Sequence, residues 1–193
     1  HAFFRRQRQM CIRDRVDAGC EYEMYAADIT RTFPVSGKFS DEQLAIYKVV
    51  LDAMNAAIDM VKPGNHIMQP QEISEKVITK GLVKLGLLDG DPEELHKSGA
   101  YKEFYMHKIG HWLGLDVHDA GDYVEGEEYM KFKPGMITTI EPGIYISSSM
   151  DVDDKWKGIG IRIEDDILVT KDGNENLTKK VPSDPEEIES LMS

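Results

Sequence analysis

The sequence predicts an α+β fold, and three observations support this. A stretch rich in β-branched and aromatic residues at 16–35 is typical of a strand pair. Two segments with helical spacing of apolar residues follow, and the rest of the chain returns to strand-like runs. Because strands and helices come in blocks, the order favours α+β over an alternating βαβ series. At 193 residues, the chain has the length of one domain.

The first block, residues 16–35, reads VDAGCEYEMYAADITRTFPV and predicts two strands with a turn near residues 21–25. Asp17 and Asp28 lie in strand-like surroundings, where aspartate is disfavoured. A hairpin that turns near residues 22 and 23 would set them opposite each other. Two adjacent carboxylates repel unless a proton or a cation lies between them. The alternative is one turn aspartate and one exposed aspartate.

Two helices are expected next. Ser40 and Gln43 form a capping box at the start of the first. Its apolar stripe precedes a stop at residues 62–64 and contains Leu44, Tyr47, Leu51, Met54, Ile58 and Val61. The second helix starts near Pro70 and ends near Gly86. A short helix is expected after Pro92.

Two strand runs follow, MITTIEPGIYI at 136–146 and IGIRIEDDILVT at 159–170. Glu141 ends an apolar stretch, and a glutamate there is costly unless it is paired. Arg162 and Glu164 share the face opposite the isoleucines of the second run, so they can hold each other or a common partner. A surface ion pair is the alternative. A turn at 172–174 and a helix at 185–192 complete the prediction.

Three histidines, His107, His111 and His118, lie in MHKIGHWLGLDVHD. The spacing of the first two is that of zinc proteases, but that pattern requires glutamate where Lys108 stands. We therefore reject a single-zinc protease. A lone histidine is usually structural or superficial, whereas three histidines beside glycines indicate a site.

Taken together, the candidates comprise four carboxylates and one imidazole, from Asp17, Asp28, His111, Glu141 and Glu164. Four negative charges match two divalent cations. Oxygen-rich ligation with one histidine favours manganese or another hard-to-borderline ion over a thiolate-type zinc site. Two such metals can share a water and convert it to hydroxide near neutral pH.

Composition limits the function classes. The chain has 41% hydrophobic and 30% charged residues, which is typical of a globular protein. No apolar run approaches the roughly 18 residues of a membrane span, and two cysteines cannot form a disulfide framework. The net charge of −12 argues against binding to nucleic acid. We expect a cytoplasmic protein that binds neither nucleic acid nor membrane.

The charge is unevenly distributed. Residues 1–15 carry +4 and the remaining residues −16. The first segment has neither a regular period nor the apolar region of a signal peptide. We interpret 1–15 as a disordered, non-native leader and begin the folded domain, residues 16–193, at Val16. A basic arm for nucleic acid is the less favoured alternative.

Four motifs resemble the catalytic domain of the Xaa-Pro aminopeptidases (aminopeptidase P), members of the pita-bread metallopeptidase superfamily. They are DAGCEYEMYAADITRTFPVSGKF, HWLGLDVHD, TIEPGIYI and GIGIRIEDD. The resemblance covers residues 16–193. It implies a curved antiparallel sheet flanked by helices, two divalent metal ions with manganese preferred, and peptide substrates with proline at the second position.

The resemblance also implies roles for individual residues. Asp17 would bind one metal, Asp28 and Glu164 would bridge both, and His111 and Glu141 would bind the other. Glu141 would act as general base, and His118 would hydrogen-bond the substrate and stabilise the tetrahedral intermediate. His107 and Arg162 would line the pocket for the proline, with Arg162 also orienting Asp17.

The family pattern also contains a catalytic histidine upstream of the first aspartate and a separate N-terminal domain, and neither is seen here. His1 has nearly the right spacing, but its neighbours do not match. We therefore expect a fold that is incomplete at its N-terminus, and a fragment with little or no activity of an enzyme that is homo-oligomeric at full length. Prolidase, which cleaves Xaa-Pro dipeptides, and a non-catalytic peptide-binding member of the fold are the alternatives.

Overall fold

The computed structural model describes residues 13–193. Most of the predicted leader therefore lies outside the described residues. Strand β1 (Arg13–Ala18) begins three residues before Val16, inside the segment that was assigned to the leader. Its partner is β4 (Ile29–Pro34), which runs antiparallel to it.

The hairpin predicted at the N-terminus is present. Beyond the β1–β4 ladder it continues as β2 (Glu21–Tyr22) and β3 (Tyr25–Ala26). Glu23 and Met24 form the turn with φ values of 50° and 72°. Two successive left-handed residues match the twist of a tight hairpin.

Helix α1 (Asp41–Ile58) begins with the predicted capping box. The Ser40 hydroxyl accepts the Gln43 N–H at 3.2 Å, and the Gln43 side chain accepts the Ser40 N–H at 2.9 Å. The helix ends before Val61, which the predicted stripe included. The amides of Met60 and Val61 bond three residues back rather than four, so the chain tightens into a turn there.

Three further helices lie where the sequence predicts them: α2 (Gln69–Lys84), α3 (Pro92–Ser98) and α4 (Pro185–Met192). Two short 3-10 helices, η1 (Ala100–Glu103) and η2 (Asp154–Trp156), lie in the connections. No helix among residues 13–193 is both long and apolar enough to cross a membrane.

The two later strand runs are each interrupted, which corrects the prediction of continuous strands. The first divides into β7 (Ile137–Ile140) and β8 (Gly143–Tyr145), and the second into β9 (Gly160–Arg162) and β10 (Asp165–Val169). β8 pairs with β9, and β7 pairs with β10. Strand β11 (Asn174–Asn176) extends the second pair, and β5 (Val124–Glu125) and β6 (Glu128–Tyr129) form a separate hairpin.

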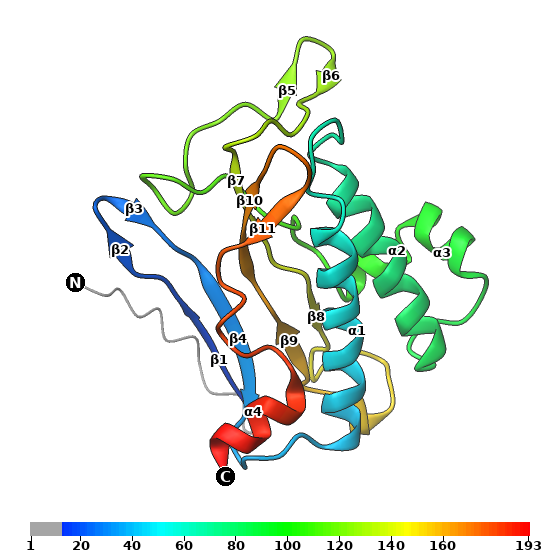
Figure 1. Ribbon diagram of the computed structural model, residues 1–193. Helices are drawn as coiled ribbons and strands as arrows, with labels where there is room; N and C mark the ends of the chain where they lie inside the picture. Colours follow the sequence, from blue (N-terminus) through cyan, green and yellow to red (C-terminus); the bar gives the residue numbers. More distant parts are fainter. Residues whose placement is uncertain (1–12) are drawn as a thin grey trace.

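The strands form a layer that α1 and α2 cover on one side (Figure 1). Helix α1 contacts α2 and the strands β7, β8 and β9. The core between them is fully buried and includes Ile46 and Val50 of α1 with Ile144 and Ile161 of the strands. Every strand pair among the described residues is antiparallel, so the fold is the predicted combination of antiparallel strands and helices.

Candidate metal centre

The five predicted ligands converge from different parts of the chain. Donor atoms of His111, Glu141 and Glu164 lie within 4.8 Å of one another, as do those of Asp17, Asp28 and Glu164. The two groups share Glu164, which is the arrangement expected of two adjacent cation sites. A third group joins Asp28 and His111 to His118.

The hairpin brings the two aspartates together differently from the prediction. Asp17 is opposite Thr30 in the ladder, not opposite Asp28. Asp28 lies in the short connection between β3 and β4. A side chain at Gly19 would collide with the Ala27 carbonyl, since the two segments approach too closely for a Cβ. This close approach lets residue 28 lie beside residue 17.

Both strand interruptions contain a predicted ligand. Glu141 lies between β7 and β8, where its amide donates to the Ile109 carbonyl at 2.6 Å. Pro142 follows and has no amide to donate. Glu164 lies between β9 and β10, where its amide donates to the Thr30 carbonyl at 3.0 Å. The two glutamates thus leave their own ladders and are held by neighbouring segments.

His111 is oriented by its own loop. Its backbone amide donates to the Thr139 hydroxyl at 3.1 Å, and its ring Nδ1 lies 3.0 Å from the Trp112 carbonyl. A carbonyl only accepts, so Nδ1 bears the hydrogen and Nε2 is free as a ligand. Nε2 lies 3.5 Å from Asp28 Oδ2 and 3.7 Å from Glu141 Oε1.

The centre is an acidic cluster without enough protein cations. Burial, together with the nearby carboxylates, raises the pKa of Glu164 to about 9. Burial likewise raises the pKa of Glu141 to about 7, although Arg162 and His111 oppose the shift. The pKa of Asp17 is raised by burial and by the adjacent Asp28. Each raised value shows that the site disfavours uncompensated negative charge.

The donor set fits divalent cations. Glu164 is 1% exposed, its Oε2 accepts the Thr30 hydroxyl at 2.5 Å, and its buried Oε1 has no hydrogen-bond partner among the described residues. A buried carboxylate oxygen without a partner, on a residue that belongs to both groups, is a candidate ligand atom. Four carboxylates with one histidine suit a hard or borderline ion such as manganese.

Arg162 and His107 are linked through a residue that the sequence analysis did not single out, Tyr145. The Tyr145 hydroxyl accepts Arg162 Nε at 2.7 Å and lies 3.0 Å from His107 Nε2. Arg162 Nη1 lies 3.2 Å from Glu141 Oε2 and 4.0 Å from Asp17 Oδ2. Arg162 therefore spans the centre rather than forming a surface pair with Glu164.

A sequence signal for Tyr145 does exist. Glu141, Gly143 and Tyr145 occupy every second position from the interruption between β7 and β8 onward. A Cβ on Gly143 would lie 2.6 Å from the Tyr145 hydroxyl, so glycine leaves room for it. Spacing alone does not show that an aromatic residue ends in the site, because Tyr145 also fits an ordinary strand pattern.

His118 lies at the open side of the centre. Its ring centroid is 4.1 Å from that of His111. A cavity of about 540 Å³ borders this side, and its lining includes Asp17, Asp28 and His118. The structure thus brings His118 to the ligands, whereas His107 lies behind Tyr145.

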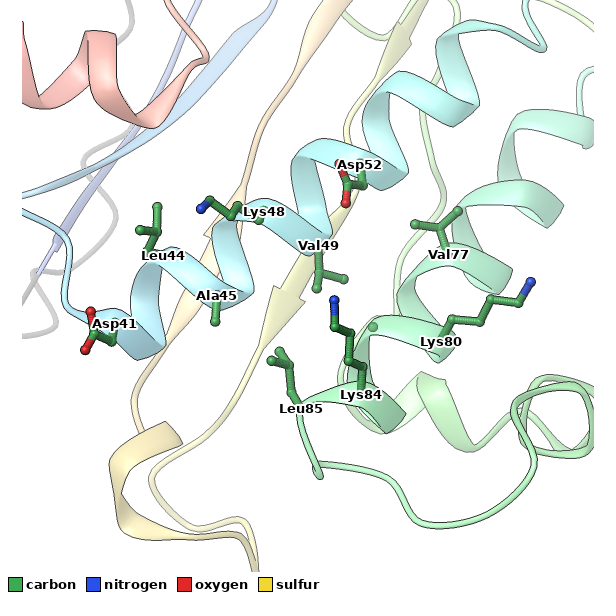
Figure 2. Close-up of a pocket in the computed structure, with 11 residues that line it drawn as sticks. Asp41, Leu44, Ala45, Lys48, Val49, Asp52, Val77, Lys80, Lys84 and Leu85 are labelled. Atoms are coloured by element: carbon green, nitrogen blue, oxygen red, sulfur yellow. The ribbon is translucent and has the colours of Figure 1, made fainter.

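A second cavity, of about 570 Å³, lies between α1 and α2 (Figure 2). Its lining combines apolar side chains such as Val49 and Val77 with Lys48, Lys80 and Lys84. None of the predicted site residues lines it, so the chemistry suggested by the sequence is confined to the centre formed by the strands.

The chain is similar to known metallopeptidases. Residues 15–171 match the model of metallopeptidase family M24. An Xaa-Pro aminopeptidase of Haemophilus influenzae is 52% identical over 178 residues, which is 92% of this chain and 41% of the relative. The corresponding protein of Escherichia coli is 50% identical over 177 residues, which is 92% of this chain and 40% of that protein.

Solved structures give the same result. Aminopeptidase PepP of Pseudomonas aeruginosa matches with a TM-score of 0.92 and 55% identity, covering 93% of this chain and 41% of that one. Proline aminopeptidase P II of Yersinia pestis matches with a TM-score of 0.89 and 50% identity over the same shares. The chain thus spans about two fifths of the length of these relatives.

Proposed function

Because the chain belongs to metallopeptidase family M24 and has the pita-bread fold of aminopeptidase P, we propose that it is part of a metal-dependent aminopeptidase that hydrolyses the N-terminal Xaa-Pro bond of peptides. The observation that carries the proposal is the convergence of five ligands in two overlapping groups. This constellation argues against a non-catalytic binding member of the fold. The similar proteins named above are Xaa-Pro aminopeptidases, which favours this activity over that of prolidase.

Two divalent cations, with manganese preferred, would be held by Asp17, Asp28, His111, Glu141 and Glu164. When bound, they would supply Lewis-acid chemistry and lower the pKa of water. They would also stabilise the ionised forms of Glu141 and Glu164, which the metal-free protein disfavours.

Glu141 is the group best placed to accept a proton from the attacking water. Arg162 Nη1 lies 3.2 Å from its Oε2 and can orient the carboxylate, and a positioned glutamate can act as general base. His118, at the open side, would hydrogen-bond the substrate and stabilise the tetrahedral intermediate. His107 and Arg162 would line the pocket for proline.

The neutral form of His107 fits this pocket. Burial and the charge of Arg162 lower the pKa of His107 to about 4. Its Nδ1 lies 2.8 Å from the Lys108 carbonyl, so Nδ1 bears the hydrogen. Its Nε2 then accepts a hydrogen bond from the Tyr145 hydroxyl. An uncharged ring offers an apolar face to a proline ring, whereas an imidazolium would not.

The metal requirement is tested on the full-length protein that contains residues 16–193. Chelation should abolish activity on an Xaa-Pro peptide, and manganese should restore it better than other divalent ions. Asp28→Asn should remove most of the activity, because Asp28 belongs to the site with Asp17 and Glu164 and also contacts His111. Full turnover in a metal-free sample would refute the proposal.

Substrate length separates the aminopeptidase from prolidase. We expect cleavage of Xaa-Pro tripeptides and longer peptides at least as fast as that of Xaa-Pro dipeptides. Comparing kcat/KM for Ala-Pro with that for Ala-Pro-Ala measures the difference directly, and a strict preference for the dipeptide would favour prolidase. We further propose that the full-length enzyme is cytoplasmic and homo-oligomeric.

A further inference from the structure

Asp166 is a buried carboxylate to which neither the sequence analysis nor the proposed chemistry gives a role. It is 2% exposed, and its Oδ1 has no hydrogen-bond partner among the described residues. The nearby guanidinium of Arg31 is already bound to Asp165 at 2.7 Å. Burying a carboxylate without a matching cation is costly, and an apolar residue would serve the core better. A cost of this kind indicates a local purpose.

The one side-chain hydrogen bond found for Asp166 reaches the metal centre. Its Oδ2 accepts the backbone N–H of Asp28 at 3.2 Å. Asp28 lies between β3 and β4, outside the ladders, so no neighbouring strand is paired with this amide. Asp166 supplies the acceptor instead, from a residue 138 positions away in the sequence.

The backbone of Asp166 is itself held by hydrogen bonds. Its amide donates to the Thr178 hydroxyl at 3.1 Å, and its carbonyl accepts the Leu177 amide at 2.9 Å. Thr178 in turn donates to Asp165 Oδ1 at 2.7 Å. Asp165 and Asp166 thus divide two tasks on adjacent residues: the first holds Arg31 and the segment around Thr178, and the second holds Asp28.

We propose that Asp166 is a positioning residue that fixes the backbone of Asp28 and so holds its carboxylate where the two cation sites meet. A carboxyl oxygen can accept the amide hydrogen whether the group is ionised or protonated, which suits a fixed support for a ligand. Groups that orient metal ligands typically change metal affinity by roughly 10- to 100-fold when removed. The inference rests on the proposed function only in requiring that the centre binds a divalent cation.

The test measures Mn²⁺ affinity by isothermal titration calorimetry on the metal-free chain, together with its melting temperature. Asp166→Ala should weaken Mn²⁺ binding roughly 10- to 100-fold. Asp166→Asn keeps an acceptor oxygen for the Asp28 amide, so it should bind Mn²⁺ distinctly more tightly than the alanine variant. In the full-length enzyme at limiting Mn²⁺, Asp166→Ala should lower apparent kcat more than it raises KM.

Asp165→Asn is the matched control, because it disturbs the adjacent ion pair with Arg31 but not the Asp28 amide. It should lower the melting temperature of the metal-free chain and leave Mn²⁺ affinity within about threefold of the original, as expected for a change that leaves the ligands in place. Equal losses of affinity in Asp165→Asn and Asp166→Ala would overturn the inference, since they would indicate general loosening. Unchanged affinity in Asp166→Ala, or asparagine no better than alanine, would also overturn it.

The two proposals fail separately. A chain that binds Mn²⁺ and responds to the variants as stated, but whose full-length form cleaves no Xaa-Pro peptide, would refute the proposed function and support the role of Asp166. Normal cleavage with unaltered Mn²⁺ affinity in Asp166→Ala would do the reverse.

Discussion

His107 and His111 show how local bonds give similar residues different tasks. In both rings Nδ1 faces a backbone carbonyl, of Lys108 or Trp112, which leaves Nε2 free. The Nε2 of His107 meets the Tyr145 hydroxyl, whereas that of His111 meets the carboxylates of Asp28 and Glu141. Burial acts to lower the pKa of both rings, but at His111 the hydrogen bonds and the negative neighbours prevail and the pKa rises. The four-residue spacing therefore does not form a chelating pair.

Tyr145 is the residue whose removal should separate pocket geometry from metal binding. Tyr145→Phe deletes the hydroxyl that joins Arg162 at 2.7 Å to His107 at 3.0 Å, and leaves the five ligands unchanged. We expect kcat/KM on an Xaa-Pro peptide to fall roughly 10- to 100-fold, since one buried charge-assisted bond is lost and Arg162 can drift from Glu141. Calorimetry should show Mn²⁺ affinity within a few fold of the original. A parallel loss of Mn²⁺ affinity would contradict this division of roles.

At this scale the sequence singled out the proposed ligands because each is an acidic or imidazole side chain in surroundings that disfavour it. An acidic side chain in an apolar strand costs folding free energy, as at Glu141 and at Asp17 beside valine. Such positions can be recognised in the sequence. The sequence did not indicate a role for Tyr145 or Asp166, for different reasons. Tyrosine is ordinary in a strand, and Asp166 follows another aspartate whose contacts are purely structural.

Among the elements, the interruptions of the strands matter most for the site. Apolar runs predicted two continuous strands, but Pro142 and the pairing of Glu164 with Thr30 break them at the two glutamates. The amides of Glu141 and Glu164 bond to the carbonyls of Ile109 and Thr30, which are distant in sequence. The position of each break therefore depends on tertiary contacts that a local pattern does not contain. The helix boundaries were better predicted, because the capping box and the turn after the stripe are local signals.

The contact between α1 and α2 depends on a missing side chain. A Cβ on Gly81 of α2 would lie 2.4 Å from Val49 Cγ1 of α1, and both residues line the cavity between the two helices. Gly81→Ala should therefore destabilise the fold by about 1–3 kcal/mol through overpacking, even though alanine favours helix. Urea unfolding measures the loss, and Mn²⁺ affinity should not change because the centre lies elsewhere.

A double-mutant cycle supplies the control for this prediction. Val49→Ala removes the atoms with which the new methyl group collides. The double variant Val49→Ala with Gly81→Ala should therefore be more stable than the sum of the single effects predicts, by at least about 1 kcal/mol. Strict additivity would show that the two helices do not meet as closely as the structure indicates.

For the molecule as a whole, negative charge dominates both the composition and the site. The net charge is −12, and four of the acidic groups converge on one centre. The sequence predicted this centre and its cation requirement. It could not predict that some of these carboxyl groups are protonated in the metal-free fold, because their raised pKa values follow from burial in the folded state.

The protonated acids make a prediction about stability and pH. In the metal-free fold the pKa values are about 7 for Glu141, about 7 for Asp166 and about 9 for Glu164. The unfolded chain has ordinary carboxyl values near 4. Between these limits the folded state binds more protons than the unfolded state, so the free energy of unfolding must fall as pH rises. His107, whose pKa is lowered, acts in the opposite sense, but only below its unfolded value of about 6.5.

Urea midpoints at about pH 7 and about pH 8.5 therefore avoid the His107 window and sample the carboxyl groups. The metal-free chain should be less stable at the higher pH. With saturating Mn²⁺ the difference should shrink or reverse, because the cations bind the deprotonated ligands and stabilise the folded state. Glu164→Gln should reduce the pH dependence of the stability of the metal-free chain, since it removes the group whose pKa is raised furthest, to about 9. Equal stability of the metal-free chain at the two pH values would contradict this prediction. It would show that the metal-free centre does not keep its carboxyl groups protonated, and that bound cations are not needed to ionise them.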